Sequence, residues 1–479
     1  MSFLTIVSIV HLLLVLFLMI RLLWRDNLSP PARLAWFLVI LSLPYAGVIV
    51  YFLFGEASLG RTINHRHDEA FARIRENDSS AFGSVALMTQ IEVEYRAPFE
   101  FVGSLAGFLP TTGNRAELMP DAATARSRLI ADIDGATDHV HVLYYIWLND
   151  QTGTNVANAL IRAAGRGVKC RAMADGLGSR AMIHSPLWKQ MSDAGVEVAV
   201  ALPFKHLIRT ILFSRLDLRN HRKITVIDGR ITYCGSQNCA DPEFRVKPKF
   251  APWVDIMVRF EGPVVAQSQL LFASDWMLHH PDASNDLFAF ATGQHADGFV
   301  AQVFGDGPTE RMGSTPQLFS TLMSHAKREL TISTPYFVPD QTVLDAICAA
   351  AHRGVTVTMI FPQKNDSWVV AAVSRSYYRR LIQAGVNIYE FKDGLLHAKT
   401  LTIDGAVTLI GSTNMDLRSF DLNYENDILL RDDELTLAVR ERQDNYISRS
   451  DRVSIEDVDS WSSSRRIWNN VVATLGPIL

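Results

Sequence analysis

His221-Arg222-Lys223-Ile224-Thr225-Val226-Ile227-Asp228, followed by Gly235-Ser236-Gln237-Asn238, has a second copy in His397-Ala398-Lys399-Thr400-Leu401-Thr402-Ile403-Asp404 and Gly411-Ser412-Thr413-Asn414. Both copies follow the pattern H-x-K-x4-D-x6-G-S-x-N. A histidine and a lysine two residues apart on a strand point to the same face. The apolar residues after them predict a buried sheet, and the Asp-Gly pair predicts a turn into a second strand. Lysine and asparagine can donate to phosphate oxygens and histidine can be nucleophile or acid, so the motif predicts a catalytic phosphate site.

The duplication extends beyond this motif. In chain order, the matched segments are residues 139–147 with 329–337, 159–168 with 346–355, and 194–196 with 384–386. In residues 159–168 and their match, an Ala-rich helix ends at glycine before a β-branched run, which predicts a helix C-cap leading into a buried strand. The chain after about residue 110 therefore predicts an α/β fold of two repeats, over residues 111–290 and 291–479.

Two apolar stretches lie at the N-terminus. Residues 3–20 are apolar apart from a few weakly polar side chains, and residues 35–54 contain no charged residue. Each is close to the roughly 20 residues that a helix needs to cross a bilayer, so we expect transmembrane helices at about 3–23 and 35–54 within residues 1–58. A cleaved signal peptide is the alternative for the first stretch, but no Lys or Arg precedes it. Residues 59–110 are expected to be a juxtamembrane linker.

The arginines around these two apolar stretches indicate on which side of the membrane the rest of the chain lies. Two spans return the chain to its starting side, and the connecting loop carries Arg21, Arg25 and Arg33. The residues after the second span include Arg61, Arg66, Arg73 and Arg75. Positive-inside counting therefore slightly favours a cytoplasmic catalytic body.

Composition narrows the class of protein. The 479 residues are 48% hydrophobic and 20% charged, which suits a packed globular body. A net charge of −4 argues against nucleic acid as the partner. The cysteines Cys170, Cys234, Cys239 and Cys348 form neither a CxxC pair nor a zinc-like cluster, so we expect reduced structural thiols and no metal site.

The double motif resembles that of the phospholipase D superfamily. With the N-terminal hairpin and the run Leu43-Pro44-Tyr45…Tyr51-Phe52-Leu53-Phe54-Gly55, the chain resembles bacterial cardiolipin synthases over essentially its full length. The resemblance implies two phospholipase D-type α/β/α repeats that form one pseudo-twofold catalytic body, preceded by a two-helix transmembrane hairpin. It also implies a bacterial inner membrane protein that joins two phosphatidylglycerol molecules into cardiolipin and releases glycerol.

The implied chemistry needs no cofactor. One imidazole attacks phosphorus to form a phosphohistidine, and the other donates a proton to the leaving alcohol and later deprotonates the acceptor. By this analogy His221 is the nucleophile and His397 the acid/base. The remaining expected roles are phosphate binding by Lys223, Lys399, Asn238, Asn414, Ser236 and Ser412, and fixing of the motif's geometry by Asp228 and Asp404.

Each imidazole also needs an orienting carboxylate. Asp255 in Trp253-Val254-Asp255 and Glu425 in Asn423-Tyr424-Glu425 are the candidates, each just before an apolar strand. The alternative is that both are exposed acids at strand ends. The two acids are not equally far along the chain from their histidines, so the two half-sites are not strictly equivalent.

The first repeat carries an insertion before its motif. From Ala-Gly-Val to the catalytic histidine takes 26 residues in the first copy (195 to 221) and 12 in the second (385 to 397). The extra residues interleave Lys205, Arg209 and Arg215 with apolar side chains, a pattern typical of helices that lie on a bilayer. An amphipathic helix packed on the core is the alternative. The C-terminal run Arg465-Arg466-Ile467-Trp468 is a weaker candidate for the same surface role.

Functions other than cardiolipin synthesis are also compatible with parts of this sequence. A hydrolytic phospholipase D, or a transphosphatidylase with another acceptor alcohol, would share every catalytic residue. A nuclease is disfavoured by the two apolar stretches and the acidic chain. A non-catalytic scaffold would be expected to have lost a His or Lys in one copy, and both copies are intact.

Overall fold

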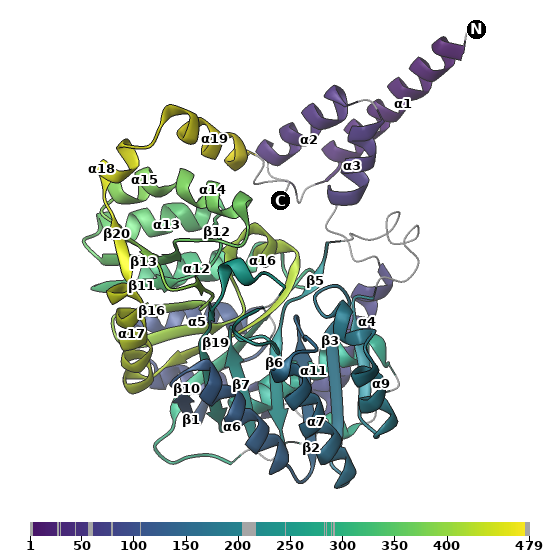
Figure 1. The fold of residues 1–479 in the computed structure, drawn as a ribbon, viewed down its shortest axis with the longest axis vertical. Helices are drawn as coiled ribbons and strands as arrows, with labels where there is room; N and C mark the ends of the chain where they lie inside the picture. The colour runs from purple at the N-terminus through teal and green to yellow at the C-terminus, as the bar shows by residue number, and fades with distance from the viewer. Residues whose placement is uncertain are drawn as a thin grey trace.

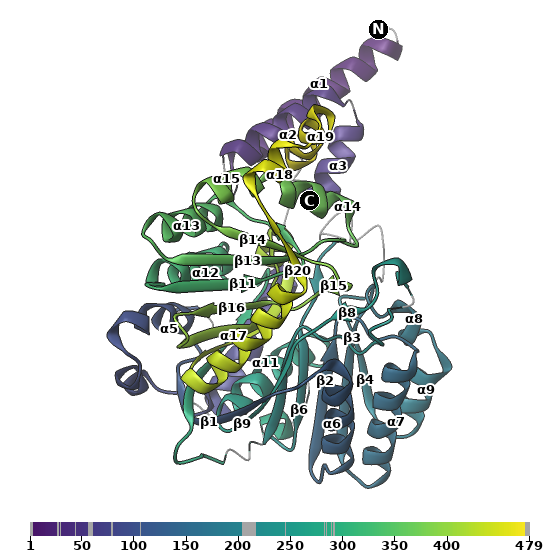
Figure 2. The same cartoon turned by 60° about the vertical axis from the view of Figure 1, so that its left-hand side comes forward.

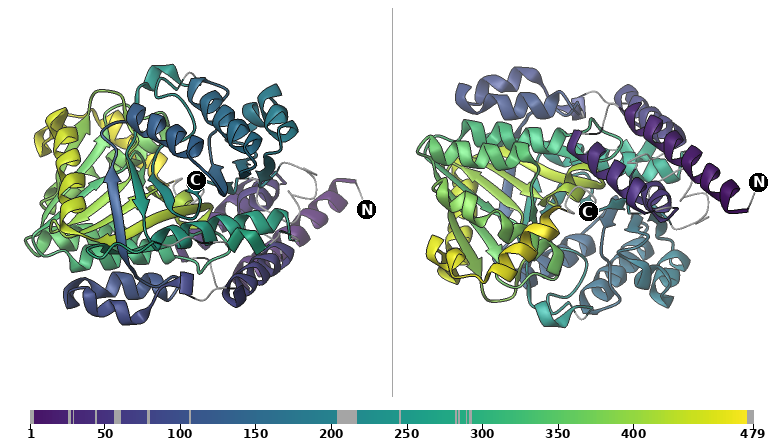
Figure 3. Two further views of the ribbon diagram at one scale, coloured as in Figure 1. Left: turned by 90° about the horizontal axis from the view of Figure 1, so that it is seen from below. Right: turned by 90° about the horizontal axis from the view of Figure 1, so that it is seen from above.

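The computed structural model describes residues 3–25, 28, 30–43, 45–55, 61–77, 80–105, 107–203, 217–244, 246–281, 283, 285–288, 290 and 293–474. An α/β body carries the N-terminal helices at one end (Figure 1). The views along the long axis show the two halves of the body side by side (Figure 3).

The strands form one large sheet. From the centre of the sheet outward, equivalent strands of the two repeats follow one another in the same order on both sides. In the first half the order is β1 (Thr111–Leu118), β9 (Met257–Glu261), β7 (Ile231–Gly235), β6 (Lys223–Ile227), β2 (His139–Tyr144), β3 (Lys169–Asp175) and β4 (Glu197–Ala201). In the second half it is β10 (Phe299–Asp306), β19 (Asn423–Arg431), β17 (Val407–Gly411), β16 (Thr400–Ile403), β11 (Glu329–Ser333), β13 (Thr356–Pro362) and β14 (Asn387–Phe391), with β20 (Ser450–Val453) added at the edge. β1 and β10 pair antiparallel at the centre, so the duplicated sequence folds as two matching halves of one sheet.

Helices flank these strands in matching positions (Figure 2). The first half has α6 (Ala122–Asp134), α7 (Gln151–Gly165), α8 (Arg180–Ile183), α9 (Pro186–Asp193) and α11 (Val264–His279). The second half has α12 (Ser314–His325), α13 (Gln341–His352), α14 (Trp368–Ser376), α15 (Tyr378–Gln383), α16 (Leu417–Asp421) and α17 (Asp433–Ser448), followed by α18 (Ile455–Asp459) and α19 (Ser463–Thr474).

The matched helices α7 and α13 begin and end in the same way. The carboxylate of Asp150 accepts from the backbone N–H of Gly153, and that of Asp340 accepts from Val343, each at 2.9 Å. Such N-caps satisfy backbone donors that the first helical turn leaves free. Past the other end, Gly167 and Gly354 both have φ of +90°, a conformation that glycine adopts without strain. The two repeats therefore share the residues that begin and end this helix as well as the helix itself.

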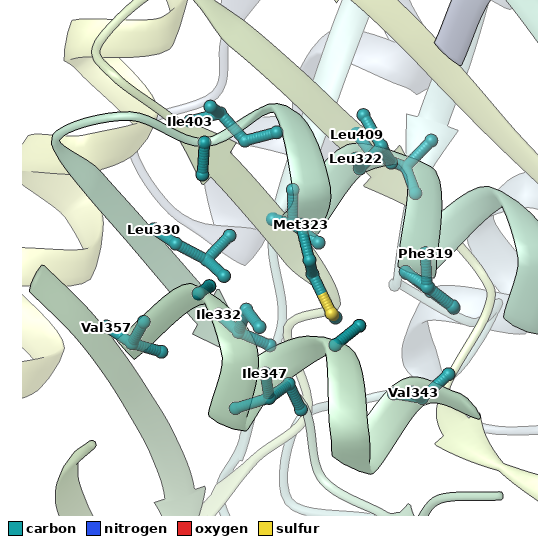
Figure 4. Close-up of a cluster of buried hydrophobic side chains, with 14 of the residues drawn as sticks. Phe319, Leu322, Met323, Leu330, Ile332, Val343, Ile347, Val357, Ile403 and Leu409 are labelled. Carbon is teal, nitrogen blue, oxygen red and sulfur yellow. The ribbon is translucent and has the colours of Figure 1, made fainter. Parts of the chain in front are cut away.

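Buried aliphatic side chains join the layers of each half. In the second half, Leu322 and Met323 of α12 and Ile347 of α13 meet Leu330 and Ile332 of β11 (Figure 4). β16 and β17 are buried on both faces, and their threonines find partners inside the fold: Thr402 bonds Gln443 and Thr408 bonds Thr436, each at 2.9 Å.

Residues 59–110 were expected to be a linker, but the described residues 61–77 and 80–105 of this segment are folded onto the body. α4 (Arg61–Asn77) lies along α11, and Arg73 donates to the backbone carbonyls of Pro281 and Ala283. α5 (Arg96–Gly103) buries Phe99 and Val102 in the core of the second half. This segment is therefore part of the folded body. Three short 3-10 helices, Ser80–Phe82, Val85–Gln90 and Val93–Tyr95, connect α4 to α5.

The expectation of one continuous second apolar helix over residues 35–54 is wrong. The structure has α1 (Phe3–Leu23), α2 (Pro30–Ser42) and α3 (Ala46–Phe54), and among the described residues only Thr5–Leu23 is long and apolar enough to cross a membrane. Pro44 has no N–H to continue the helix, and Tyr45 has a positive φ of 61°. α3 consequently packs back on α2, with the rings of Trp36 and Tyr51 edge to face at 5.4 Å.

Asp228 and Asp404 occupy equivalent turns at the ends of β6 and β16. The Asp404 carboxylate accepts from the backbone N–H groups of Lys327, Arg328 and Glu329 and from the Tyr95 hydroxyl. Asp228 accepts from the backbone of residues 137–139. Both have a left-handed backbone, with φ of 52° and 56°. The two aspartates therefore anchor the turn to the neighbouring strand.

We predict that Asp404→Ala lowers the free energy of unfolding by more than about 2 kcal/mol, because several buried donors lose their acceptor. Asp404→Asn should cost less, since asparagine tolerates the left-handed conformation and keeps one acceptor oxygen. Denaturant unfolding of both variants, with the exposed Glu441→Ala as control, measures this. Unchanged stability in Asp404→Ala would contradict the anchoring role.

Candidate active site

The two motif histidines lie where each half reaches across to the other. His221 follows β5 (Arg219–Asn220), which pairs with β19 of the second half, and its backbone N–H donates to Tyr424 at 2.9 Å. His397 follows β15 (Leu395–Leu396), which pairs with β8 (Trp253–Val254) of the first half, and donates to Val254 at 2.8 Å. Each histidine is therefore placed by backbone pairing with the opposite repeat.

The orienting carboxylates are also exchanged between the halves. His221 Nδ1 lies 2.8 Å from Glu425 Oε2, and His397 Nδ1 lies 2.6 Å from Asp255 Oδ1. The sequence suggested both acids, and the structure shows that each serves the histidine of the other repeat. With Nδ1 held by a carboxylate, Nε2 is the ring nitrogen left for chemistry.

The motif serines hold these carboxylates. Ser236 Oγ donates to Asp255 at 2.6 Å and accepts from the backbone N–H of Ile256. Ser412 Oγ donates to Glu425 at 2.5 Å and accepts from Asn426. The carboxylates take the serine protons in this structure, and donation from these hydroxyls to phosphate stays a prediction.

The two lysines are buried beside the histidines. Lys223 Nζ donates to the His221 carbonyl at 2.6 Å, and Lys399 Nζ donates to the His397 carbonyl at 2.7 Å. An ammonium has three donors, so each lysine keeps N–H groups for a bound anion. Both side chains lie near the imidazoles on their own motif, in keeping with the two-residue spacing.

The motif asparagines hydrogen-bond within their own repeats. Asn238 accepts from the backbone N–H of Ile146 at 3.3 Å, which leaves its amide nitrogen as a donor. Asn414 donates to Ser419 at 3.2 Å, and its buried side-chain oxygen has no partner among the described residues.

Aromatic rings cover both imidazoles, a feature that the sequence analysis missed. The Tyr145 ring lies 4.8 Å from that of His221, and Lys223 Nζ lies 5.6 Å from the Tyr145 centroid. The Trp253 ring lies 4.5 Å from that of His397. The sequence did carry signals for these rings. A tyrosine stands near the end of each matched strand, and a tryptophan stands two residues before Asp255.

Arg222 is a second residue that the sequence analysis missed. Its guanidinium pairs with Asp275 at 2.6 Å and donates to the backbone carbonyls of Glu425 and Asp306. The second copy of the motif has Ala398 at this position. Arg222 therefore ties the first motif to the strand that carries Glu425, and it has no counterpart in the other half-site.

Burial and the two lysines shape the proton affinities. Burial lowers the pKa of His397 to about 4, with Lys399 adding to the effect, and holds the pKa of His221 well below its ordinary value. Burial lowers the pKa of Lys223 to about 8 and that of Lys399 to about 7. The site without an anion therefore favours neutral imidazoles.

The two carboxylates differ in the direction in which their pKa is shifted. Burial raises the pKa of both acids, but at Asp255 the charge and hydrogen bond of His397 outweigh it and the pKa falls below its ordinary value. The pKa of Glu425 stays raised by burial despite the nearby Lys223. Asp255 is thus the acid better suited to stabilise a protonated imidazole.

The predicted lipid-contact residues Lys205, Arg209 and Arg215 lie outside the described part of the chain. The residues on either side do have a defined place. Leu202 packs with Leu218, Leu422 and Tyr424, next to the strand that carries Glu425.

The chain matches known proteins along its length. Residues 129–276 and 319–446 match the family described as cardiolipin synthase, PLD-like domain, and residues 3–56 match the phospholipase D-nuclease N-terminal family. Cardiolipin synthase A of Edwardsiella ictaluri is 35% identical, covering 97% of this chain and 95% of its own. Cardiolipin synthase A of Yersinia pseudotuberculosis serotype O:1b is 34% identical, covering 93% and 91%.

A solved structure shares the fold. The phosphatidylserine synthase of Haemophilus influenzae Rd KW20 superposes with a TM-score of 0.59 at 15% identity, covering 81% of this chain and all of that one. The full-length relatives, the matching family and the duplicated motif agree, and the chain belongs to the cardiolipin synthase family of phospholipase D-like proteins.

Proposed function

We propose that this protein is a membrane-anchored phosphatidyltransferase that joins two phosphatidylglycerol molecules into cardiolipin and releases glycerol. The observation that carries the proposal is the pair of exchanged His–carboxylate contacts, His221 with Glu425 and His397 with Asp255, flanked by two buried lysines. Relatives named cardiolipin synthase A, similar over nearly the whole chain, support the choice of substrate.

In the first step, Nε2 of neutral His221 attacks the phosphorus of one phosphatidylglycerol. The N–P bond forms as the bond to the glycerol oxygen breaks, and protonated His397 gives its proton to that oxygen. The pairing of His397 with the more acidic Asp255 supports this assignment, because an ionised carboxylate stabilises imidazolium.

In the second step, the hydroxyl of another phosphatidylglycerol gives its proton to His397. Its oxygen attacks phosphorus, and the bond to His221 breaks. Lys223 and Lys399 offset the negative charge that develops on the nonbridging oxygens. The anionic headgroup in turn favours their charged forms and raises the proton affinity of His397. One phosphodiester replaces another, so no nucleotide is needed.

The N-terminal segment supports a membrane location. α1 is long and apolar enough to span a bilayer, and α2 and α3 are short apolar helices packed on each other. We propose that all three lie in a bacterial inner membrane and that the catalytic body is cytoplasmic. Lys205, Arg209 and Arg215 would then meet anionic headgroups, which fits the place of Leu202 and Leu218 beside the site.

The strand order supports a division of the body into two repeats. We propose one catalytic body made of repeats over residues 111–290 and 291–479. The halves of the sheet on each side of β1 and β10 support it. Residues 59–110 connect the membrane segment to both repeats through α4 and α5.

A product assay tests the function. Purified protein in phosphatidylglycerol vesicles should form cardiolipin and free glycerol in equal amounts. His397→Ala should lose nearly all turnover, since one imidazole cannot serve as both nucleophile and acid, whereas exposed His352→Ala should be unaffected. Phosphatidic acid as the main product would instead indicate a hydrolase, and a phosphatidyl ester of an added alcohol would indicate a broader transphosphatidylase.

The exchanged carboxylates lead to a second prediction. Glu425→Gln and Asp255→Asn should each lower kcat by roughly 10²- to 10⁴-fold, as expected when an orienting carboxylate becomes an amide. Exposed Glu434→Gln is the matched control, and steady-state assays in mixed micelles measure the change. Wild-type kcat in either variant would show that its carboxylate does not assist the histidine across the interface.

The lowered lysine pKa values predict a pH-dependent anion affinity. A lysine loses its charge as pH rises through its pKa, so sulfate, which stays ionised, should bind about tenfold or more weakly at about pH 9 than at about pH 7. Lys399→Arg should reduce the dependence because arginine stays charged. Calorimetry measures the affinity, and a constant value over this range would contradict the assigned lysine environment.

A further inference from the structure

We propose that the surface formed by α14 and α19 is a second membrane contact, which seats in the headgroup region of an anionic bilayer. The inference rests on the proposed membrane location of the protein. It adds a place where the catalytic body itself touches lipid.

α19 presents an apolar face to solvent. Ile467, Trp468 and Val471 are 63%, 51% and 50% exposed. Their spacing puts them along one stripe of the helix, and Asn469 and Val472, which lie beside that stripe, are buried. Exposed apolar groups of this size in a continuous stripe mark an interaction surface.

α14 extends this face. Trp368 is 66% exposed, and its ring stacks on that of Trp468 at 5.8 Å and 22°. Val472 packs with Ala372 and Val373 beneath the two rings, which holds α19 against α14. Among the described residues after α3, these are the tryptophans whose side chains are largely exposed. Tryptophan favours the interface between water and lipid, where its ring is buried and its N–H stays hydrated.

Charge at one end of the surface fits anionic lipid. Arg465 and Arg466 are exposed in the first turns of α19, and the Arg465 guanidinium lies 4.2 Å from the Trp461 ring centroid. Arginine beside an apolar stripe is the pattern of helices that lie in the headgroup layer. The occupant that this combination favours is a bilayer containing phosphatidylglycerol.

The position of the surface agrees with this occupant. In Figures 1 and 2, α19 lies at the end of the body from which α1, α2 and α3 extend. α14 begins just after Asp366, whose carboxylate binds Tyr336 of the second half and Lys247 of the first. A helical anchor alone leaves the body free to tilt, and a second contact here would fix the orientation of both halves against the lipid.

Depth-dependent quenching tests the contact. All four native cysteines are buried, so a cysteine introduced at an exposed site can be labelled selectively. Full-length Ile467→Cys, carrying a polarity-sensitive fluorophore, should show a blue shift and loss of emission in vesicles of phosphatidylglycerol with doxyl-labelled lipid. Leu437→Cys, 52% exposed on α17 beside Gly405, is the control and should show neither.

Equal quenching at both sites would overturn the proposal. Energy transfer between labelled copies without lipid quenching would also overturn it, since a second copy would then cover the surface. The readout does not depend on turnover, so His397→Ala protein should give the same quenching. Trp368→Ser with Trp468→Ser should slow cardiolipin formation in vesicles relative to detergent micelles, and an equal rate in both would contradict a lipid contact.

Discussion

The exchange of histidine and carboxylate between repeats is the interaction on which the site depends. Glu425 and Asp255 are buried, and each holds the Nδ1 of an imidazole contributed by the other half. Removing a carboxylate from water is costly unless it is hydrogen-bonded, so these contacts bind the halves together as well as orienting the rings. A single repeat would leave a histidine without its carboxylate, which agrees with the proposal that the two repeats build one site.

The two half-sites differ in structure, which agrees with the different tasks proposed for their histidines. Arg222 ties the first motif to β19, whereas Ala398 stands in its place in the second. Asp255 is held below its ordinary pKa and Glu425 above it. In the proposed mechanism the imidazole beside Asp255 is therefore the one that is protonated when an anion binds, and the other acts as the neutral nucleophile. Two-step transfer needs this difference, because one histidine must carry the phosphatidyl group while its partner moves the proton.

Local patterns predicted much of this protein, and long-range contacts account for the rest. The repeated spacing from His221 and His397 identified the duplication and the lysines, and the apolar strands that follow Asp255 and Glu425 suggested the two orienting acids. Sequence spacing could not show that Asp255 and Glu425 each bind the histidine of the other repeat. Nor could it show that the hydroxyls of Ser236 and Ser412 donate to these two acids, because the fold and not the sequence brings these residues together. Hydropathy identified the apolar residues 35–54 but not the break at Tyr45, and it gave no sign that Phe99 and Val102 belong to the core.

Trapping of the covalent intermediate tests the shared site most directly. Enzyme quenched during turnover with labelled phosphatidylglycerol and mapped by peptide should carry at most one phosphatidyl group per chain, on His221. One phosphorus served by two imidazoles allows no more. Two groups per chain, one on His221 and one on His397, would show two independent half-sites and contradict the account.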